Sequence, residues 1–592
     1  NLDYLEELGI NTIWITPIVD NIDDGMEMAN GDKRYGYHGY WAKDFTKIDE
    51  NLGDKETFAT LIDEAHDRGM KIMVDVVLNH AGYGMNNADQ FEGMIRENPV
   101  ATDDILGELD GLPDFKTEDP EVRKKIIQWQ VDWIKELDKF TTKNNNTIDY
   151  FRVDTVKHVD NTTWNAFKNE ITKVKPDFKM IGEWYGASVN STGDQLRTGR
   201  MDSLLDFNFK GQAERFIKGN ISQVEKELSD RNGKIDNTAM LGQFLSSHDE
   251  DGFLVARAKG DEGLFKVAAA LQITAKGQPV IYYGEELGQS GLMHDDSVDR
   301  YYDENRYNLD WSIANDENDM LTHYKKLLNI REDYSDVFSK GTRQHIAGDD
   351  ESGYSVFTRT YGDKQIFVGL NTTEEAVDST FTVDLVAGTE VIDVYNDVTY
   401  VVAADGTVTI DIPGNADGGT VILVAGDTVE EPVDPEEPVE PETPGDDRLD
   451  KIANRLEDLE TAIDEITTNN LALVEELNVI RAEYERLRGL DAVTDAKIAD
   501  LLARIAALEA IVADIGSESL GTGTDTPGVG GEEADGSDTD DSTKEDAATD
   551  SEEDNLPLTG ETNSLMVSII GLVFIGSGVA LAFTFKKDER KE

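Results

Sequence analysis

The chain has 592 residues, more than one ordinary domain needs, and carries 121 acidic against 55 basic side chains, for a formal charge of −66. So acidic a surface repels nucleic acid and anionic lipid, and neither is expected as a partner. The complete lack of cysteine excludes disulfides, thiolate metal sites and a cysteine nucleophile.

The first residues look like one helix followed by one strand. Leu2, Leu5 and Leu8 fall on one face of an expected helix, and the apolar run 12–15 follows at once. Because residue 1 is Asn and the chain opens inside this helix, we expect the natural protein to begin earlier, with any signal peptide in the missing part.

Residues 1–335 alternate short apolar runs with amphipathic helical stretches such as 55–68 and 122–138. The expected strands are 12–15, 71–77, 148–153, 178–182, 204–207, 240–244 and 279–282. This alternation predicts an α/β domain with a parallel sheet, and the number of units favours a (β/α)8 TIM barrel. An eighth strand, the first of the barrel, would precede residue 1. Residues 81–120 interrupt the pattern and are expected to form a small insert after the third barrel strand, on the active face.

Residues 336–426 change to short strands separated by Gly and Asp turns, which predicts an all-β C-terminal accessory domain, a sandwich. Residues 427–447 contain ten acids, five prolines and no Lys or Arg. Such a linker cannot bury a core and is expected to be an extended spacer.

Residues 448–515 show apolar side chains at alternating spacings of three and four, from Leu449 to Ile515. A sustained pattern of this kind predicts a coiled coil, in which Asn470 at a seam position could set the register. Gly489 in the weaker middle leaves a second interpretation open, a helical hairpin within one chain. The coiled coil would make the protein a homo-oligomer, and the hairpin would not.

The C-terminal part reads as an anchor. Residues 516–555 form an expected disordered acidic linker, 556–560 read Leu-Pro-Leu-Thr-Gly, 565–585 are uncharged and mostly apolar, and 586–592 are a basic tail. Together these segments resemble the LPxTG sorting signal of Gram-positive surface proteins. The resemblance implies cleavage after Thr559 by a sortase and covalent attachment to peptidoglycan. The alternative is an ordinary C-terminal transmembrane anchor at 565–585.

Ionisable side chains gather where several expected strands end. They include Asn79-His80, Arg152-Val153-Asp154 followed by Lys157-His158, Glu183 with Trp184, and His248-Asp249. Any one of these stretches could be a solvated turn. A parallel barrel, however, brings the carboxyl ends of its strands to one mouth, so that one Asp, one Glu and another Asp would meet there.

These stretches resemble the conserved regions of the α-amylase family, glycoside hydrolase family 13. Residues 37–41, 111–114 and 277–285 add to the likeness, which covers nearly all of 1–426. The resemblance implies that Asp154 is the nucleophile, Glu183 the general acid/base and Asp249 the third carboxylate, which binds sugar hydroxyls. A retaining glycosidase needs one ionised and one protonated carboxyl about 5–5.5 Å apart.

The same resemblance implies a set of substrate-binding residues. His80 and His248 would donate to sugar hydroxyls, Tyr40 would stack on the sugar, and Arg152 would keep Asp154 ionised by its charge. Further residues expected around the substrate are His38, Trp41, Lys157 and His158. For Trp41 and Trp184, buried packing is an equally open interpretation.

The resemblance also implies a calcium ion that ties the insert to the barrel. Asn79, Asp114 and the main-chain carbonyl of His158 match its ligands, and all three are oxygen donors, as Ca²⁺ requires. The alternative is that Asn79 and Asp114 only make turn hydrogen bonds.

The resemblance therefore implies a wall-anchored α-amylase that cuts internal α-1,4-glucosidic bonds in starch-like glucans by a retaining double displacement. Lys157-His158 is similar to α-amylases and cyclodextrin glucanotransferases, whereas the arginine that many amylases carry shortly after the third carboxylate is missing behind Asp249. The alternatives are a transglycosylase of the neopullulanase or cyclodextrin type and a non-catalytic surface glucan-binding protein.

Overall fold

A computed structural model describes residues 1–27, 33–137, 146–236, 240–295, 300–301 and 304–425, together with single helical residues between 452 and 505. The described residues up to 425 belong to one compact unit, and those from 452 onward belong to a second. We describe each unit by itself.

Seven parallel strands form the central sheet of the first unit, as the sequence predicts for 1–335. In spatial order they are β1 (Thr12–Ile15), β6 (Lys71–Val76), β7 (Tyr150–Val153), β8 (Lys179–Gly182), β9 (Ser203–Asp206), β10 (Met240–Phe244) and β11 (Gln278–Val280). Each strand pairs with the next strand in that order, so the carboxyl ends of all seven point to one side. This TIM-barrel-like arrangement confirms the predicted α/β class.

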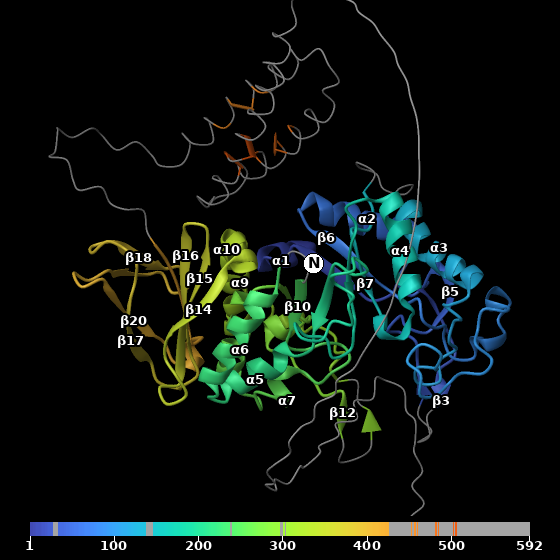
Figure 1. Cartoon of the computed structure of the whole chain (residues 1–592), viewed down its shortest axis with the longest axis horizontal. Helices are drawn as coiled ribbons and strands as arrows, with labels where there is room; N and C mark the ends of the chain where they lie inside the picture. The colour runs from blue at the N-terminus through green and yellow to red at the C-terminus, as the bar shows by residue number, and fades with distance from the viewer. Residues whose placement is uncertain are drawn as a thin grey trace, which may run out of the picture. The chain divides into compact units, whose positions relative to one another are not determined.

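Helices cover the outside of the sheet (Figure 1). They are α1 (Leu2–Leu8), α2 (Lys55–Asp67), α3 (Pro120–Leu137), α4 (Asn161–Val174), α5 (Phe209–Ile217), α6 (Ile221–Lys234), α7 (Phe253–Ala256), α8 (Glu262–Thr274), α9 (Asp319–Asp333) and α10 (Ser335–Lys340). Several begin at a side-chain cap: Asp160, for example, accepts from the amides of Thr162 and Thr163 before α4.

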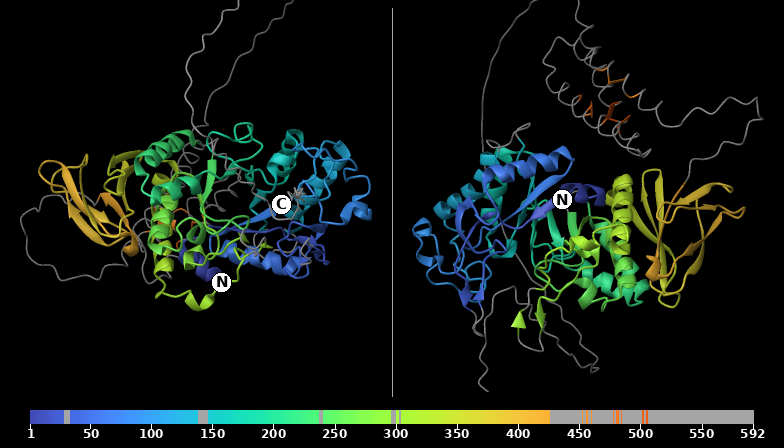
Figure 2. Two further views of the ribbon diagram at one scale, coloured as in Figure 1. Left: turned by 90° about the horizontal axis from the view of Figure 1, so that it is seen from below. Right: turned by 180° about the vertical axis from the view of Figure 1, so that it is seen from behind.

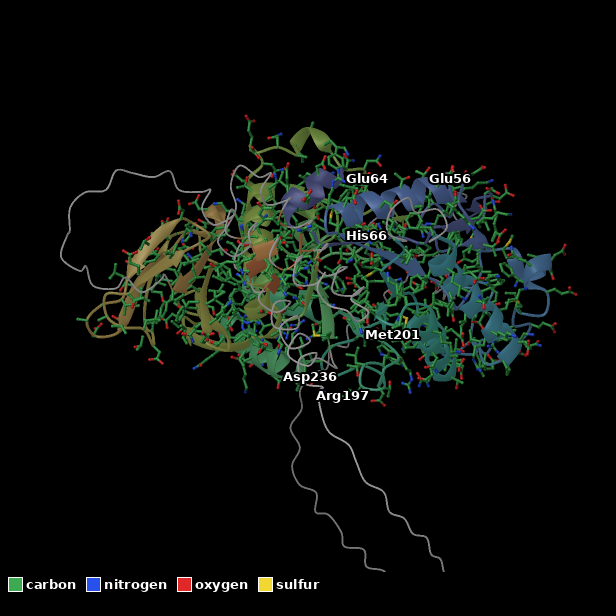
Figure 3. The ribbon with its side chains drawn as sticks, turned by 90° about the horizontal axis from the view of Figure 1, so that it is seen from above. Glu56, Glu64, His66, Arg197, Met201 and Asp236 are labelled. Carbon is green, nitrogen blue, oxygen red and sulfur yellow. The ribbon has the colours of Figure 1, made fainter. Side chains whose placement is uncertain are left out.

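The inner strands β6 to β10 are mostly buried on both faces, as a sheet covered by helices requires, whereas the outer strands β1 and β11 are only partly buried. Phe151 of β7 stacks on Phe167 of α4, and the fully buried Trp164 lies beside Phe167. The acidic excess lies outside this core: Glu56 and Glu64, labelled in Figure 3, are solvent-accessible on α2. Arg197 and Asp236, also labelled there, form an exposed pair 3.5 Å apart.

Two small antiparallel pairs lie on the active face, and the sequence analysis did not expect them. The strand β2 (Val19–Asn21) pairs with β5 (Ala42–Ile48), and β3 (Met26–Glu27) pairs with β4 (Lys33–Arg34). The charged side chains along β5 hid its strand character, because only two of its seven residues are buried. These pairs present the segment 35–41 at the carboxyl ends of the barrel strands.

Residues 81–120, the expected insert, contain the single 3₁₀ turns η1 (Met85–Asn87) and η2 (Asp89–Phe91) and end where α3 begins at Pro120. A bridge between His80 and Asp114 fastens this segment to the chain shortly after β6, and a second bridge, between Ile95 and Phe115, lies within the segment. The segment therefore hangs from the carboxyl end of a barrel strand, where a catalytic face is expected.

The predicted all-β domain follows. Its main sheet contains β14 (Thr342–Ala347), β15 (Tyr354–Tyr361), β16 (Lys364–Asn371), β21 (Thr420–Ala425), β18 (Glu390–Asp393) and β19 (Val398–Val401), in that spatial order. A second sheet of β17 (Val377–Thr382) and β20 (Thr407–Ile412) packs on it through a shared apolar core. Helices α9 and α10 lie beside the main sheet (Figure 2). A buried pair, Arg343 with Glu225 of α6 at 2.7 Å, also joins the barrel to this domain.

In the second unit the described residues are helical, and those on the expected seam, such as Ile452, Leu456, Ile480 and Ile505, are buried. The coiled coil stays a prediction.

The linkers, the sorting motif at 556–560, the apolar span 565–585 and the basic tail lie outside the described residues. Within the part of the chain that the structure describes, no helix is long and apolar enough to cross a membrane.

Candidate active site

Three carboxylates meet at the carboxyl ends of the barrel strands. Asp154 follows β7, Glu183 follows β8 and Asp249 lies five residues beyond the end of β10. All three line one cavity of about 160 Å³ together with Tyr40 and His80. The tertiary fold thus brings together three acids that are up to about a hundred residues apart in the chain, as expected of a barrel mouth.

One buried guanidinium holds the centre of the site together. Arg152 is 1% exposed, and its Nη1 donates to Asp154 at 2.7 Å and to Asp75 at 3.1 Å. Its Nη2 lies 3.2 Å from Glu183. Residues two apart on a strand share a face, which explains why Arg152 reaches Asp154. Arg152 therefore contacts three acids at once.

Glu183 is a buried carboxyl surrounded by other acids. Burial raises the pKa of Glu183 to about 8, and the negative charges of Asp154 and Asp249 act in the same direction, against the lowering effect of Arg152. At neutral pH this carboxyl is therefore mainly protonated and able to give a proton. Its Oε2 accepts from the amide of Thr155 at 3.1 Å.

Thr155 has a positive φ of 50°, in the left-handed region that β-branched residues avoid. The strained turn directly after Asp154 aims the Thr155 amide at Glu183 and so connects the two carboxyl groups through the backbone.

Asp249 is held from two sides. His248 lies 3.0 Å and Arg306 3.2 Å from its carboxylate. Burial alone would raise the pKa of Asp249, but the charges of His248 and Arg306 and the hydrogen bond from His248 outweigh it, so that the pKa lies below the usual range. Asn305, which is 1% exposed, donates to the carbonyls of His248 and Glu250 and clamps the loop.

Asp75, the last residue but one of β6, is a central residue of the site to which the sequence pattern assigned no role. It accepts from Tyr40 Oη at 2.6 Å and from Trp14 Nε1 at 3.3 Å, besides its contact with Arg152. Burial raises the pKa of Asp75 to about 6. A charged residue inside the apolar run Ile-Met-Val-Asp-Val-Val was the available signal, because a buried acid needs partners.

The aromatic and histidine residues expected at the substrate lie around the same cavity. The Tyr40 ring stacks on His248 at 5.5 Å, and its hydroxyl lies 2.9 Å from His248 Nε2. His38 also lines the cavity, and its Nδ1 accepts from the Tyr40 amide at 3.1 Å. Burial lowers the pKa values of His38, to about 3, and of His80, so both rings are neutral hydrogen-bonding groups.

The two tryptophans behave as packing residues to different degrees. Trp41 lines the cavity yet is only 3% exposed, and its ring packs edge-on against His38. Trp184 packs against the main core of the barrel. Both observations favour the packing interpretation over open stacking on a sugar.

Lys157 and His158 do not line the cavity. They form the turn η3 (Val156–His158), where Lys157 Nζ lies 3.4 Å from Asp104 and His158 Nδ1 lies 2.9 Å from the Asp104 carbonyl. Both side chains thus face the insert, because the turn at Thr155 redirects the chain.

The residues expected to bind calcium leave two buried oxygens without a partner. Asn79 and Asp114 are each 1% exposed, and neither Asn79 Oδ1 nor Asp114 Oδ1 has a hydrogen-bond partner among the described residues. The other oxygen of Asp114 accepts from Arg96 at 2.7 Å. Two orphaned oxygens suit a hard cation. Among the described residues, no cluster of three or more His, Cys, Asp and Glu could hold a metal, so such a site would need amide and carbonyl donors.

The cavity is also lined by Lys33, Arg34, Tyr35, Leu109 and Leu112, which the sequence did not single out as substrate-binding residues. A larger hollow of about 320 Å³ between α5 and α6 contains none of the three carboxylates. The acids and arginines that line it are largely paired with one another, as Asp206 is with Arg231 at 2.7 Å. The smaller cavity is therefore the candidate active site.

Comparison with known proteins agrees with this geometry. The model of the α-amylase catalytic domain matches residues 1–104 and 105–361. The chain therefore belongs to the α-amylase family, glycoside hydrolase family 13. The LPXTG cell wall anchor motif matches 548–590, which marks an extracellular protein that is covalently attached to the wall of a Gram-positive cell.

Curated relatives include a cyclomaltodextrinase from Geobacillus thermopakistaniensis, 29% identical over 65% of this chain and 63% of that protein. An intracellular maltogenic amylase from Bacillus subtilis is 28% identical over 62% and 60%. The chain thus spans about three fifths of the length of these relatives. Among solved structures, the α-amylase from Geobacillus thermoleovorans complexed with acarbose has a TM-score of 0.61 at 26% identity, covering 72% of this chain and 91% of that one.

Proposed function

We propose that this protein is a cell-wall-anchored α-amylase that hydrolyses internal α-1,4-glucosidic bonds of starch-like glucans with retention of configuration. The observation that carries the proposal is the difference between two neighbouring carboxyls. The Arg152 guanidinium pairs with Asp154 at 2.7 Å, while burial raises the pKa of Glu183 and keeps it protonated at neutral pH. A retaining glycosidase requires this division between a nucleophile and an acid.

The first chemical step uses both carboxyls. Glu183 gives its proton to the glycosidic oxygen while Asp154 attacks the anomeric carbon. The bond to the leaving glucan breaks, that glucan departs as an alcohol, and a glycosyl ester on Asp154 remains. Glu183 is now a carboxylate.

The second step returns the site to its starting state. Glu183 takes a proton from water, whose oxygen attacks the anomeric carbon and breaks the ester, so that Asp154 is released as a carboxylate. The two attacks come from opposite faces of the sugar, so each inverts the anomeric carbon and the configuration is retained overall. A sugar hydroxyl in place of water would give transfer instead of hydrolysis.

The surrounding residues suit a sugar ring in the cavity. Asp249, kept ionised by Arg306 and His248, can accept from two neighbouring hydroxyls and favour a distorted ring. His80 and His248 can donate, and the Tyr40 ring offers a stacking face. Asp75 acts one step away, because it holds both Tyr40 and Arg152.

A second candidate function is transfer or cleavage of the cyclodextrin or neopullulanase type. Two observations favour it: the curated relatives carry the names cyclomaltodextrinase and maltogenic amylase, and the exposed Tyr185 stands two residues after Glu183, where an incoming sugar could rest.

We also propose a structural calcium ion held by Asn79, Asp114 and the His158 carbonyl, which would join the insert to the barrel. The orphaned oxygens of Asn79 and Asp114 support it. The ion would supply charge compensation for buried oxygens and would take no part in the two steps.

The stalk at 448–515 and the linkers on either side of it would hold the barrel away from the wall to meet insoluble substrate. Deleting 448–515 should slow release of sugar from starch granules by whole cells, with an unchanged rate on soluble maltotetraose. Equal rates on granules with and without the stalk would contradict this role.

The central experiment measures reducing sugar released from starch, pullulan and cyclodextrin by the full natural protein, beside Asp154→Asn, Glu183→Gln and the surface control Glu50→Gln. We expect activity on starch that both site variants abolish and the control retains. Activity on cyclodextrin or pullulan alone would favour the second candidate. A folded protein inactive on all three would instead be a surface glucan-binding protein.

A further inference from the structure

Lys210, the second residue of α5, is a buried cation that the two chemical steps do not use. It is 9% exposed, and its ammonium forms an ion pair with Glu250. The same group lies over two aromatic rings, 5.5 Å from the centre of Phe207 and 5.2 Å from that of Phe244. Burial lowers the pKa of Lys210 to about 7, whereas the Glu250 carboxylate and the two ring faces favour its charged form.

The partner of Lys210 belongs to the catalytic loop. Glu250 directly follows Asp249, and Asn305 holds its carbonyl at 3.0 Å. Lys210, which follows β9, therefore binds this loop through Glu250, while Asn305 and Arg306 bind its main-chain carbonyls. The loop is fixed at its main chain by one segment and at its side chain by another.

The aromatic rings under Lys210 connect it to Tyr185, two residues after the proposed acid/base Glu183. Phe207 packs edge-on against Phe244 at 5.2 Å and lies 5.1 Å from the ring of Tyr185. Tyr185 is 37% exposed and stands two residues after Glu183. Exposed aromatic rings are the usual resting face of a sugar.

We propose that Lys210 is a positioning residue that sets how the glycosyl ester is divided between water and a sugar acceptor. Lys210 pairs with Glu250 of the Asp249 loop and lies over the Phe207 ring, which packs against Tyr185. One side chain therefore fixes the Asp249 loop relative to Tyr185, where we place the acceptor sugar. The assignment rests on the proposed function. In the step concerned, the acceptor oxygen bonds to the anomeric carbon, the ester bond to Asp154 breaks, and the acceptor proton goes to Glu183.

The test uses Lys210→Met in the full chain, because methionine keeps an apolar stem over the rings and removes the charge. Products from maltotetraose are sorted into those longer than the substrate and those shorter. We expect the ratio of transfer to hydrolysis to change at least about threefold and kcat/KM to fall about tenfold, because Glu250 is left unpaired beside Asp249. Lys218→Met, on the exposed end of the same helix and paired with Glu214, should leave both quantities unchanged.

Two further variants separate positioning from simple support. Lys210→Arg should restore the product ratio, and adding Glu250→Gln to Lys210→Met should restore most of kcat/KM because the unpaired charge is gone. A purely structural role would lower the melting temperature of Lys210→Met without moving the product ratio, and that result would overturn the proposal. If Lys210→Met does not fold, the single variant Glu250→Gln carries the same expectation for the ratio.

The outcomes also distinguish failure of the role assigned to Lys210 from failure of the proposed function. An active parent protein whose product ratio is the same in Lys210→Met overturns the assignment of Lys210 alone. A folded parent that releases no sugar from any glucan refutes the proposed function, and the assignment with it.

Discussion

The Arg306 guanidinium lies 3.2 Å from the Asp249 carboxylate and also donates from Nε to the His248 carbonyl at 2.8 Å. The sequence directly after Asp249 lacks the arginine that many α-amylases carry there, which leaves the acceptor subsites in doubt but not the three carboxylates. In the structure an arginine reaches the Asp249 carboxylate from a segment 57 residues further along the chain.

Replacing Arg306 by Met should lower kcat/KM for maltotetraose about 10- to 100-fold, because a charged hydrogen bond to a partly buried carboxylate is lost. The pKa of Asp249 should rise, so the acidic limit of activity should move to higher pH. The measurement is a pH profile of kcat/KM beside Arg197→Met, which removes an exposed pair. A profile identical to that of the parent would show that Arg306 does not act on Asp249.

Glu183 should set the alkaline limit of the reaction. Because burial raises its pKa to about 8, kcat/KM for starch should fall as the pH rises through about 8. A substrate such as α-maltosyl fluoride, whose leaving group needs no proton, should keep its first step in Glu183→Ala. An alkaline limit that persists with this fluoride in the variant would assign the limit to another group.

The same pKa shift has a consequence for stability. A carboxyl with a raised folded-state pKa binds its proton more tightly when folded, so its contribution to stability is full below the unfolded value and is lost as the pH rises toward about 8. Glu183→Gln should therefore melt higher than the parent at pH 8 and by a smaller margin at pH 4. Differential scanning calorimetry at both values measures this. An equal margin at the two values would contradict the shift.

Tyr40 is expected to serve the site through its hydroxyl as well as its ring. Tyr40→Phe loses hydrogen bonds to Asp75 at 2.6 Å and to His248 at 2.9 Å, and should lower kcat about tenfold with little change in KM. Tyr40→Ala should in addition raise KM, because the stacking face is gone. Steady-state kinetics on maltotetraose separates the two effects. Equal kinetics for Tyr40→Phe and the parent would leave the hydroxyl without a role.

The proposed calcium ion would hold the insert to the barrel, so its removal should loosen the insert. We expect a chelator to lower the melting temperature and added Ca²⁺ to restore it, an effect that Asp114→Asn should abolish. Glu118→Gln is the matched control, since Glu118 pairs with Arg96 beside Asp114 but is not an expected ligand. If neither the chelator nor Ca²⁺ changes the melting temperature of the parent, the proposal of a structural calcium ion is wrong.

Elements with a strong local pattern were predictable. The strand Ile148–Val153 combines β-branched and aromatic residues with a charged end, and the structure has β7 over Tyr150–Val153. The pair β2 and β5 was missed because Lys43, Asp44 and Lys47 gave β5 the composition of a loop. Its strand form depends on pairing with β2, a partner whose effect no local propensity shows.

The sequence by itself determined the α/β, barrel-like class and the anchor signal, and it identified the three carboxylates as candidates, because each of these depends on residues adjacent in the chain. Only the tertiary structure decided the environment of these acids. Asp75, Arg306 and Lys210 reach the site from separate segments, whereas Lys157 and His158 turn away toward Asp104. Contacts between distant segments depend on how the elements pack, and burial and charge at those contacts set the protonation that the proposed chemistry requires.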